Sequence, residues 1–271
     1  MLKQAYENLT KYYNKLDDDY KSLSNKYYVI KNLYYSLNKS ITSLSEQSKS
    51  FLIIPFAFPR VLNKQEVFSL DVTYAVLYAV KDPRDMWDSF KNIFWYVYNN
   101  IRYAHDQPQL FVQPILITYE GEAWVTDMSI QTFNNYIQTP TETLKFKHGD
   151  CEDQAILLYA MLWNYMERML GKVYSIYLAD IVFSDGSAHM AIFIPVEGGK
   201  LTIMDTAGGY LTEYFGTITA RDALEELQRY SRHWYSAGGI IAITLYWVDV
   251  DTGYYVPVVS GDIYTVAKFL R

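Results

Sequence analysis

The fold is decided by the stretch His148-Gly149-Asp150-Cys151-Glu152-Asp153-Gln154-Ala155, which contains the only cysteine of the 271-residue chain. Asp150 is a favoured N-cap residue, because its carboxylate can accept the free amide protons of a first helical turn. Cys151 then takes the first helical position, and no glycine or proline follows before Gly171. The positive end of the helix dipole favours the thiolate, which is the nucleophilic form of cysteine.

A structural interpretation of Cys151 competes with this one. A lone cysteine on an apolar helix is commonly a small buried hydrophobic residue. Glu152 and Asp153 suit the helix dipole, but their charge disfavours a neighbouring thiolate. A basic partner is therefore required if Cys151 is to act as a nucleophile.

The segment 187–205 supplies a basic candidate on a predicted hairpin. A strand starting near His189 is followed by the turn Glu197-Gly198-Gly199 and by a returning strand that ends at Asp205. A two-residue loop would place the side chains of His189 and Asp205 on opposite faces, since the side-chain period of a strand is two. A three-residue loop pairs Val196 with Lys200 and brings His189 and Asp205 onto one face. The residues that would share this face are Phe193, Leu201 and Ile203.

A cysteine, a histidine and an aspartate could thus act as nucleophile, general base and base-orienting residue. The other interpretation makes His189 a hydrogen-bonded core residue and Asp205 a turn residue. The chain order, with a hairpin joining the last two residues, favours the catalytic interpretation.

Several segments resemble the transglutaminase-like superfamily in its microbial and archaeal branch. The stretch Gly149-Asp150-Cys151-Glu152-Asp153-Gln154-Ala155 resembles the cysteine motif of that family. Thr139-Pro140-Thr141-Glu142-Thr143-Leu144 is similar to its Pro-x-Glu-Thr-Leu lead-in, and Ile101-Arg102-Tyr103 is similar to the end of the preceding helix. Ala188-His189-Met190 and Met204-Asp205-Thr206 match its histidine and aspartate blocks in order and spacing.

The resemblance covers roughly residues 84 to 210 and implies an α+β fold. Its papain-like core would pack the cysteine-bearing helix on an antiparallel sheet, with a Cys151-His189-Asp205 triad. The family acts on amide bonds through a thioester, either hydrolysing peptides and other amides or transferring the acyl group to amines, and some members have lost activity. The implied partner is a protein or peptide substrate, and no cofactor is implied.

The resemblance also implies an oxyanion site formed by the Cys151 amide and an upstream aromatic or amide side chain. Trp124 and Tyr136 are both candidates. The tryptophan common before the proline lead-in is absent, and Tyr136-Ile137-Gln138 occupies that region.

The N-terminal segment has six unbroken heptads without glycine or proline. They predict a coiled-coil helix over residues 1–45, which associates through residues 2–44 with another copy of the chain. A helix through Leu44 would be roughly 65 Å long. The alternative is a helix that folds back onto the globular domain, because additional apolar residues widen the stripe. The heptad positions are Leu2, Tyr6, Leu9, Tyr13, Leu16, Tyr20, Leu23, Tyr27, Ile30, Tyr34, Leu37, Ile41 and Leu44.

Residues 46–60 are predicted to be a serine-rich linker and an apolar docking segment too short to span a bilayer. Residues 61–271 then form the transglutaminase-like domain. Within it we expect an amphipathic helix over 83–100, a loop-rich region over 104–130 with a strand at 111–119, and a helix over 219–234 capped by Thr219.

Composition restricts the function classes. The formal net charge of −6 argues against a broad nucleic-acid surface, and one cysteine excludes an internal disulfide framework or a multi-cysteine metal site. His105, His148 and His233 have no partners at metal-ligand spacing, so no metal is expected. With no signal peptide or membrane span evident, we expect a cytoplasmic protein. The abundance of tyrosine is associated with thermophilic archaea and their mobile elements.

Two functional hypotheses follow from these patterns. In the first, the protein is a thiol enzyme, a cysteine protease or amidase or an acyltransferase. In the second, the domain is catalytically silent and the protein is a scaffold or assembly protein that works through its coiled coil.

Overall fold

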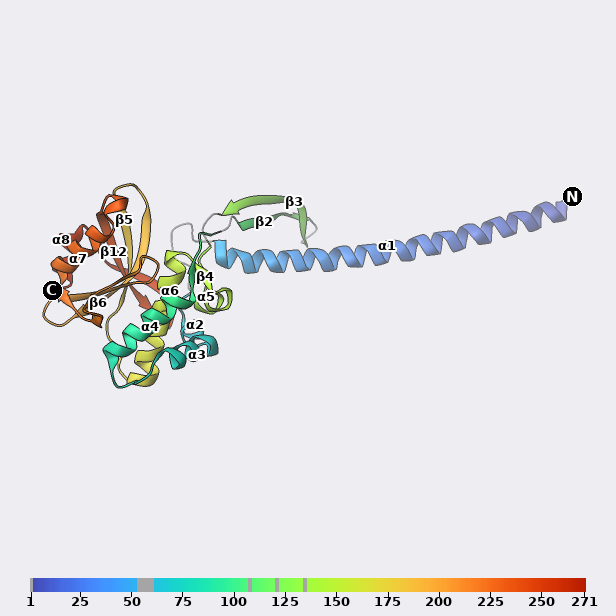
Figure 1. The fold of residues 1–271 in the computed structure, drawn as a ribbon. Coiled ribbons are helices and arrows are strands. Elements are labelled where there is room, and N and C mark those ends of the chain that lie inside the picture. The colour runs from blue at the N-terminus through green and yellow to red at the C-terminus, as the bar shows by residue number, and fades with distance from the viewer. Residues whose placement is uncertain (1, 53–60, 107–108, 120–121, 134–135) are drawn as a thin grey trace. The chain divides into compact units, whose positions relative to one another are not determined.

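The computed structural model describes all residues except 1, 53–60, 107–108, 120–121 and 134–135 (Figure 1). The chain divides into two compact units. Met1–Pro55 and Leu110–Phe133 form the first, and Phe56–Gln109 and Asn134–Arg271 form the second.

The first unit consists of one long helix and a two-stranded sheet. Helix α1 spans Leu2–Leu52, and strands β2 (Gln109–Tyr119) and β3 (Glu122–Phe133) pair with each other. The helix therefore includes residues 46–52, which we expected to be linker; residues 53–60 lie outside the described residues. The strand expected at 111–119 is confirmed as β2. Strand β3 was missed, because its mixture of polar and apolar residues resembles a loop until its partner strand is known.

The heptad side chains of α1 are exposed wherever the structure describes them. Exposure ranges from 41% for Tyr34 to 73% for Tyr13. Between Tyr6 and Leu37, the described residues of the chain leave the stripe exposed to water. An apolar row of this length on one helix is typical of a surface that another chain covers.

The second unit begins with helices. The expected helix at 83–100 starts at Met86, because Asp85 and not the region of Pro83 provides the N-cap. Thr139 and Glu142 form a capping box at the start of the helix Pro140–Phe146. The helices of this part are α2 (Lys64–Val67), α3 (Leu70–Ala79), α4 (Met86–Asn100), α5 (Pro140–Phe146) and α6 (Cys151–Tyr165), the last followed by a π-helical turn, Met166–Leu170.

An antiparallel sheet in the order β11-β7-β6-β5-β12-β13 forms the centre of the unit, with β8 paired to β7. The sequence did not indicate β5, which lies between β6 and β12. Its strands are β5 (Tyr177–Phe183), β6 (Ala188–Val196), β7 (Lys200–Asp205), β8 (Tyr210–Leu211), β11 (Arg221–Asp222), β12 (Ile240–Asp249) and β13 (Tyr254–Gly261). Two short pairs complete the unit: β1 (Arg102–Tyr103) with β4 (His148–Gly149), and β9 (Glu213–Tyr214) with β10 (Thr217–Ile218).

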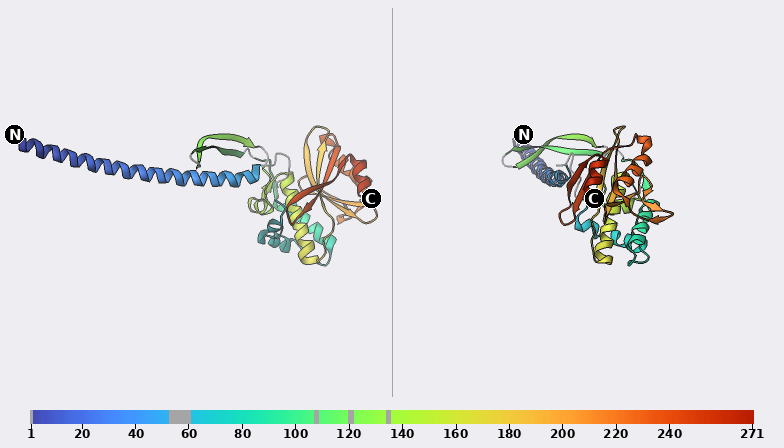
Figure 2. Two further views of the ribbon diagram at one scale, coloured as in Figure 1. Left: turned by 180° about the vertical axis from the view of Figure 1, so that it is seen from behind. Right: turned by 90° about the vertical axis from the view of Figure 1, so that its left-hand side faces the viewer.

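Helices cover both faces of this sheet (Figure 2). Apolar residues of α6, α3 and α4 pack with Leu178, Ile192 and Val248 of the sheet. On the other face, α7 (Ala223–His233) and α8 (Ile263–Phe269) pack with Ala191, Phe193 and Leu245. The architecture is α+β, as expected, and α6 lies in the largest apolar core.

The expected helix at 219–234 begins later than predicted. Asp222 is its N-cap and accepts hydrogen bonds from the amides of Leu224 and Glu225, at 3.0 and 3.2 Å. Thr219 was the wrong cap, because its amide and carbonyl are already bonded to Thr212 and Thr202 at 3.0 and 2.6 Å.

Candidate active site

The start of α6 is fixed by a buried aspartate. Asp153 accepts the Gln138 amide at 2.7 Å and the Asp150 amide at 3.3 Å. A Cβ atom at Gly149 would lie 2.6 Å from the Cβ of Asp153, so only glycine fits there. These contacts place Cys151 at the first position of the helix and tie the incoming chain to it.

Cys151 is a free and partly buried cysteine at the start of α6. Its Sγ donates a hydrogen bond to Glu152 Oε2 at 3.1 Å. Burial, followed by the charge of Glu152, raises the pKa of the thiol far above its ordinary value. The backbone amide of Met190 opposes this by favouring the thiolate. The carboxylates and burial therefore outweigh the helix dipole.

The hairpin has the register that unites His189 and Asp205. Val196 pairs with Lys200, so residues 197–199 form a three-residue connection. His189 Nε2 lies 2.8 Å from Asp205 Oδ1, and both side chains are buried. Phe193, Leu201 and Ile203 lie in the same apolar cluster, as the alternation predicted.

Asp205 is held by three donors. Oδ1 accepts the Gly208 amide at 2.7 Å in addition to the imidazole, and Oδ2 accepts the Tyr230 hydroxyl at 2.7 Å. An acceptor at Nε2 favours the tautomer with the proton on that nitrogen. His189 Nδ1 then carries the lone pair, and it has no hydrogen-bond partner among the described residues.

Cys151 and His189 approach the site from different elements. α6 packs on β6, and the amide of Met190, the residue after His189, lies at the Cys151 sulfur. Within the described part of the chain, no hydrogen bond joins the thiol to the imidazole. The structure thus unites His189 with Asp205, and it places the Cys151 sulfur near the backbone of Met190, the residue after His189.

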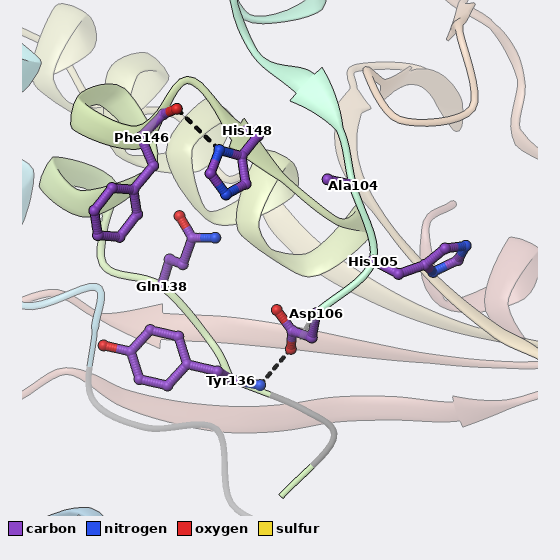
Figure 3. A pocket seen from close by; sticks show the side chains of 7 residues that line it. All are labelled: Ala104, His105, Asp106, Tyr136, Gln138, Phe146 and His148. Atoms are coloured by element: carbon purple, nitrogen blue, oxygen red, sulfur yellow. Dashed lines mark hydrogen bonds between the residues drawn. The ribbon is translucent and has the colours of Figure 1, made fainter. Parts of the chain in front are cut away.

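A cavity of about 300 Å³ lies beside the segment that leads into α6 (Figure 3). The Tyr136 hydroxyl donates to Glu142 at 3.0 Å, and its amide donates to Asp106. Burial raises the pKa of Tyr136 to about 12. Trp124 lies in β3, and its side chain is outside the described residues. The lining residues are Ala104, His105, Asp106, Tyr136, Gln138, Phe146 and His148.

Sequence reasoning missed Gln138 as a candidate. It is 5% exposed and its side-chain oxygen has no partner among the described residues. The available signal for Gln138 was its position in Tyr136-Ile137-Gln138, the segment where the tryptophan common in the family is absent.

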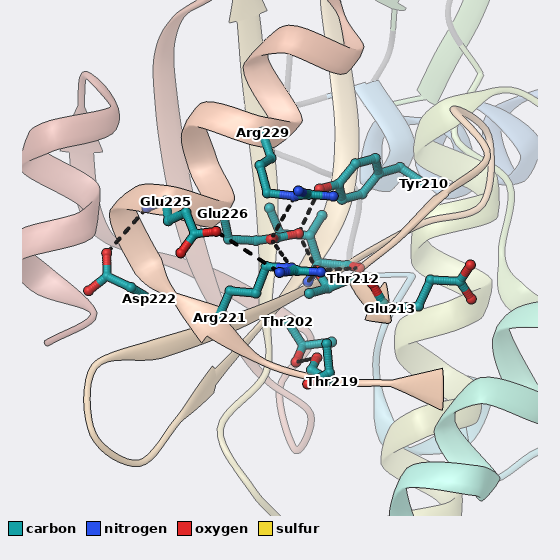
Figure 4. A network of polar contacts seen from close by, with 11 residues as sticks. Thr202, Tyr210, Thr212, Glu213, Thr219, Arg221, Asp222, Glu225, Glu226 and Arg229 are labelled. Atoms are coloured by element: carbon teal, nitrogen blue, oxygen red, sulfur yellow. Dashed lines mark hydrogen bonds and ion pairs between the residues drawn. The ribbon is translucent and has the colours of Figure 1, made fainter. Parts of the chain in front are cut away.

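The buried carboxylate of Glu226 links α7, which also carries Tyr230, to the segment that follows Asp205 (Figure 4). Glu226 Oε1 accepts the hydroxyls of Tyr210 and Thr212, each at 2.6 Å. Its Oε2 lies 3.4 Å from Arg221 Nε and 3.7 Å from Arg229 Nε. Because this charge is fully buried, the two nearby arginines offset part of the cost of its desolvation.

The comparison with known families agrees with this geometry. The family profile described as "Transglutaminase-like domain" matches residues 71–228, more than half of the chain. The chain therefore belongs to the transglutaminase-like family. No curated protein matches it. Among the helices of the described residues, none is long and apolar enough to cross a membrane.

Proposed function

We propose that the protein is a thiol enzyme that acts on amide bonds through a thioester on Cys151. The observation that carries the proposal is the buried pair of His189 and Asp205, 2.8 Å apart. His189 Nδ1 has no hydrogen-bond partner among the described residues, and the amide of the next residue, Met190, lies near the Cys151 sulfur. Membership of the transglutaminase-like family supports the same chemistry.

In the proposed reaction, Cys151 Sγ attacks the carbonyl carbon of the amide while His189 Nδ1 takes the thiol proton. Asp205 orients the imidazole and stabilises the imidazolium. Collapse of the tetrahedral intermediate breaks the C–N bond, and His189 returns the proton to the leaving amine. Water then attacks the thioester, giving a carboxylic acid and restoring the thiol.

Donors at the start of α6 would stabilise the oxyanion. The Cys151 amide is one, since the first amides of a helix lack intrahelical partners. Gln138 is a better second donor than Tyr136, because the Tyr136 hydroxyl is already bonded to Glu142. Trp124 remains a candidate from the sequence.

The resting thiol is not an ion pair with His189. Its proton is directed at Glu152, so the thiol must turn from Glu152 towards His189 before attack. Alkylation by iodoacetamide requires the same turn, so its rate also reports on His189. Hydrolysis is preferred over amine transfer, because water needs no second substrate site.

Two measurements test the proposal. Casein is incubated with the protein, with and without a biotinylated primary amine, and ammonia release and amine incorporation are followed. Ammonia or new peptide termini, lost in Cys151→Ser and in His189→Ala, would support hydrolysis. Amine incorporation lost in both variants would support transfer. If neither product forms, and iodoacetamide alkylates Cys151 equally in the wild-type and His189→Ala proteins, the enzyme proposal is wrong.

A second function, assembly through α1, is favoured by the exposed heptad stripe. We propose that α1 forms a coiled coil with a second copy of the chain. Assembly would survive Cys151→Ser. The two functions are compatible, because a coiled coil would place several catalytic domains on a multivalent target.

A further inference from the structure

Three carboxylates converge beside Cys151 from two separate segments. Asp106 follows β1, whereas Asp150 and Glu152 flank the cysteine at the start of α6. One oxygen from each lies within 4.8 Å of one from each of the others. The separation of 44 residues between Asp106 and Asp150 explains why no spacing pattern revealed the cluster.

Asp150 is the residue that most needs a partner. It is 8% exposed, and its Oδ1 has no hydrogen-bond partner among the described residues. A buried carboxylate oxygen without a donor is costly unless a proton or cation neutralises it.

No cation of the described chain balances the cluster. None of the ion pairs formed by described lysine, arginine or histidine side chains involves Asp106, Asp150 or Glu152. The fourth nearby carboxylate, Asp153, accepts two backbone amides and adds negative charge.

We propose that Asp106, Asp150 and Glu152 bind one hard divalent cation of the size of calcium. Three atoms no more than 4.8 Å apart share a point within about 2.8 Å of each, close to the 2.3–2.6 Å typical of calcium–oxygen bonds. The shorter bonds of magnesium would require the cluster to contract.

The surroundings suit a partly hydrated ion. Asp106 lines the cavity of Figure 3, so water can enter from that side and complete the coordination. One Asp106 oxygen receives the Tyr136 amide, which fixes the carboxylate and leaves the other oxygen for the ion. This site does not rest on the proposed enzyme function, because the three carboxylates would attract a cation whether or not Cys151 reacts.

Terbium luminescence in the full-length protein tests the site. Tb³⁺ replaces Ca²⁺ at oxygen sites, and nearby tyrosines such as Tyr103 and Tyr136 can sensitise its emission. We expect saturable emission that Ca²⁺ displaces more effectively than Mg²⁺. Asp106→Asn and Glu152→Gln should weaken Ca²⁺ binding by at least about tenfold.

Matched variants make the result specific. Asp18→Asn removes one charge from the exposed Asp17-Asp18-Asp19 run and should leave binding unchanged, as should Cys151→Ala. Far-UV circular dichroism checks that each variant is folded. Saturable binding that is equal in the wild-type, Asp106→Asn and Glu152→Gln proteins would overturn the proposal. Absence of binding, or displacement of Tb³⁺ by a lysine-rich peptide but not by Ca²⁺, would also overturn it.

Because Cys151→Ala keeps the site, failure of metal binding and failure of catalysis are distinguishable. A protein that binds Ca²⁺ but cleaves nothing would retain this inference and lose the enzyme proposal. A protein that cleaves amides but binds no Ca²⁺ would retain the enzyme proposal and lose this inference.

Discussion

Trp234 lies against the imidazole of His189, with ring centroids 4.5 Å apart and planes inclined at 50°. Phe183 contacts both rings, at 6.3 Å from His189 and 5.1 Å from Trp234. The imidazole is therefore held between aromatic side chains on one side and Asp205 on the other. An aromatic face also stabilises a protonated imidazole through its quadrupole.

Replacing Trp234 should weaken the proposed base. Trp234→Ala frees the imidazole to rotate, so we expect a loss on the order of tenfold in His189-dependent reactivity of Cys151. The measurement is the difference in iodoacetamide rate between each protein and its His189→Ala derivative. Trp234→Phe retains a ring and should retain most of the difference. Equal rates in Trp234→Ala and the wild-type protein would contradict a positioning role.

Tyr230→Phe should destabilise the fold through Asp205. Removing the hydroxyl leaves Asp205 Oδ2 buried without its 2.7 Å donor, which costs about 1–3 kcal/mol of unfolding free energy. Urea denaturation measures the change. The control is Tyr235→Phe, because Tyr235 is 83% exposed and should change stability little. Equal effects of the two substitutions would show that the Tyr230 hydroxyl does not stabilise Asp205.

Gly208→Ala should damage both stability and the histidine–aspartate pair. The new Cβ would lie 2.2 Å from Asp205 Oδ2 and 2.5 Å from Trp234 Cζ2, so these buried groups must move. We expect a loss of about 1–3 kcal/mol in unfolding free energy and a reduced His189 dependence of Cys151 alkylation. Gly171→Ala is the control, because its new Cβ would meet no atom within 4 Å. The φ of +69° at this position favours glycine, so the substitution should lower the unfolding free energy by about 1 kcal/mol and leave alkylation unchanged. An unchanged His189 dependence in Gly208→Ala would contradict this prediction.

Local patterns in the sequence predicted much of this site. The Asp150 position before an unbroken helix predicted where α6 begins. The alternation along 189–205 allowed two hairpin registers, and the structure has the one that joins His189 to Asp205. These features depend on neighbours within one helix or one hairpin, where side-chain period and turn length are decisive.

Long-range relationships could not be predicted in the same way. Tyr230 and Trp234 reach the histidine–aspartate pair only because α7 packs on that face of the sheet. The contact of Glu152 with the Cys151 thiol depends on a rotamer, not on spacing. Strand β5 has no local partner, so its place beside β6 required the complete sheet.

Asp180→Asn should stabilise the protein at neutral pH. Asp180 lies on β5, paired with Met190 and Thr244 of the flanking strands, and burial followed by the charge of Glu152 raises the pKa of its carboxyl. Tyr246 is a further titratable group near it. A folded-state pKa above the unfolded value means that stability is present at low pH and is lost as pH rises through the folded pKa.

The variant should therefore have a higher Tm than the wild-type protein at pH 7. The two should converge near pH 3, below the ordinary aspartate pKa of about 3.9. Asp185→Asn is a suitable control of opposite sign, because hydrogen bonds from Ser187 lower the pKa of the exposed Asp185. A Tm difference for Asp180→Asn that does not change with pH would exclude titration of this carboxyl as its cause.

Leu23→Asp should disrupt assembly through α1. Leu23 is 67% exposed in the single chain, and a coiled coil would bury it at a heptad core position. A charge buried there without a partner would weaken association on the order of a hundredfold or more. Analytical ultracentrifugation over a range of protein concentrations measures the change. Asn25→Asp adds the same charge two residues away, off the heptad core, and should leave the assembly intact. If the wild-type protein sediments as a monomer at all concentrations, another explanation is needed for a row of leucine and tyrosine that extends from Tyr6 to Leu37.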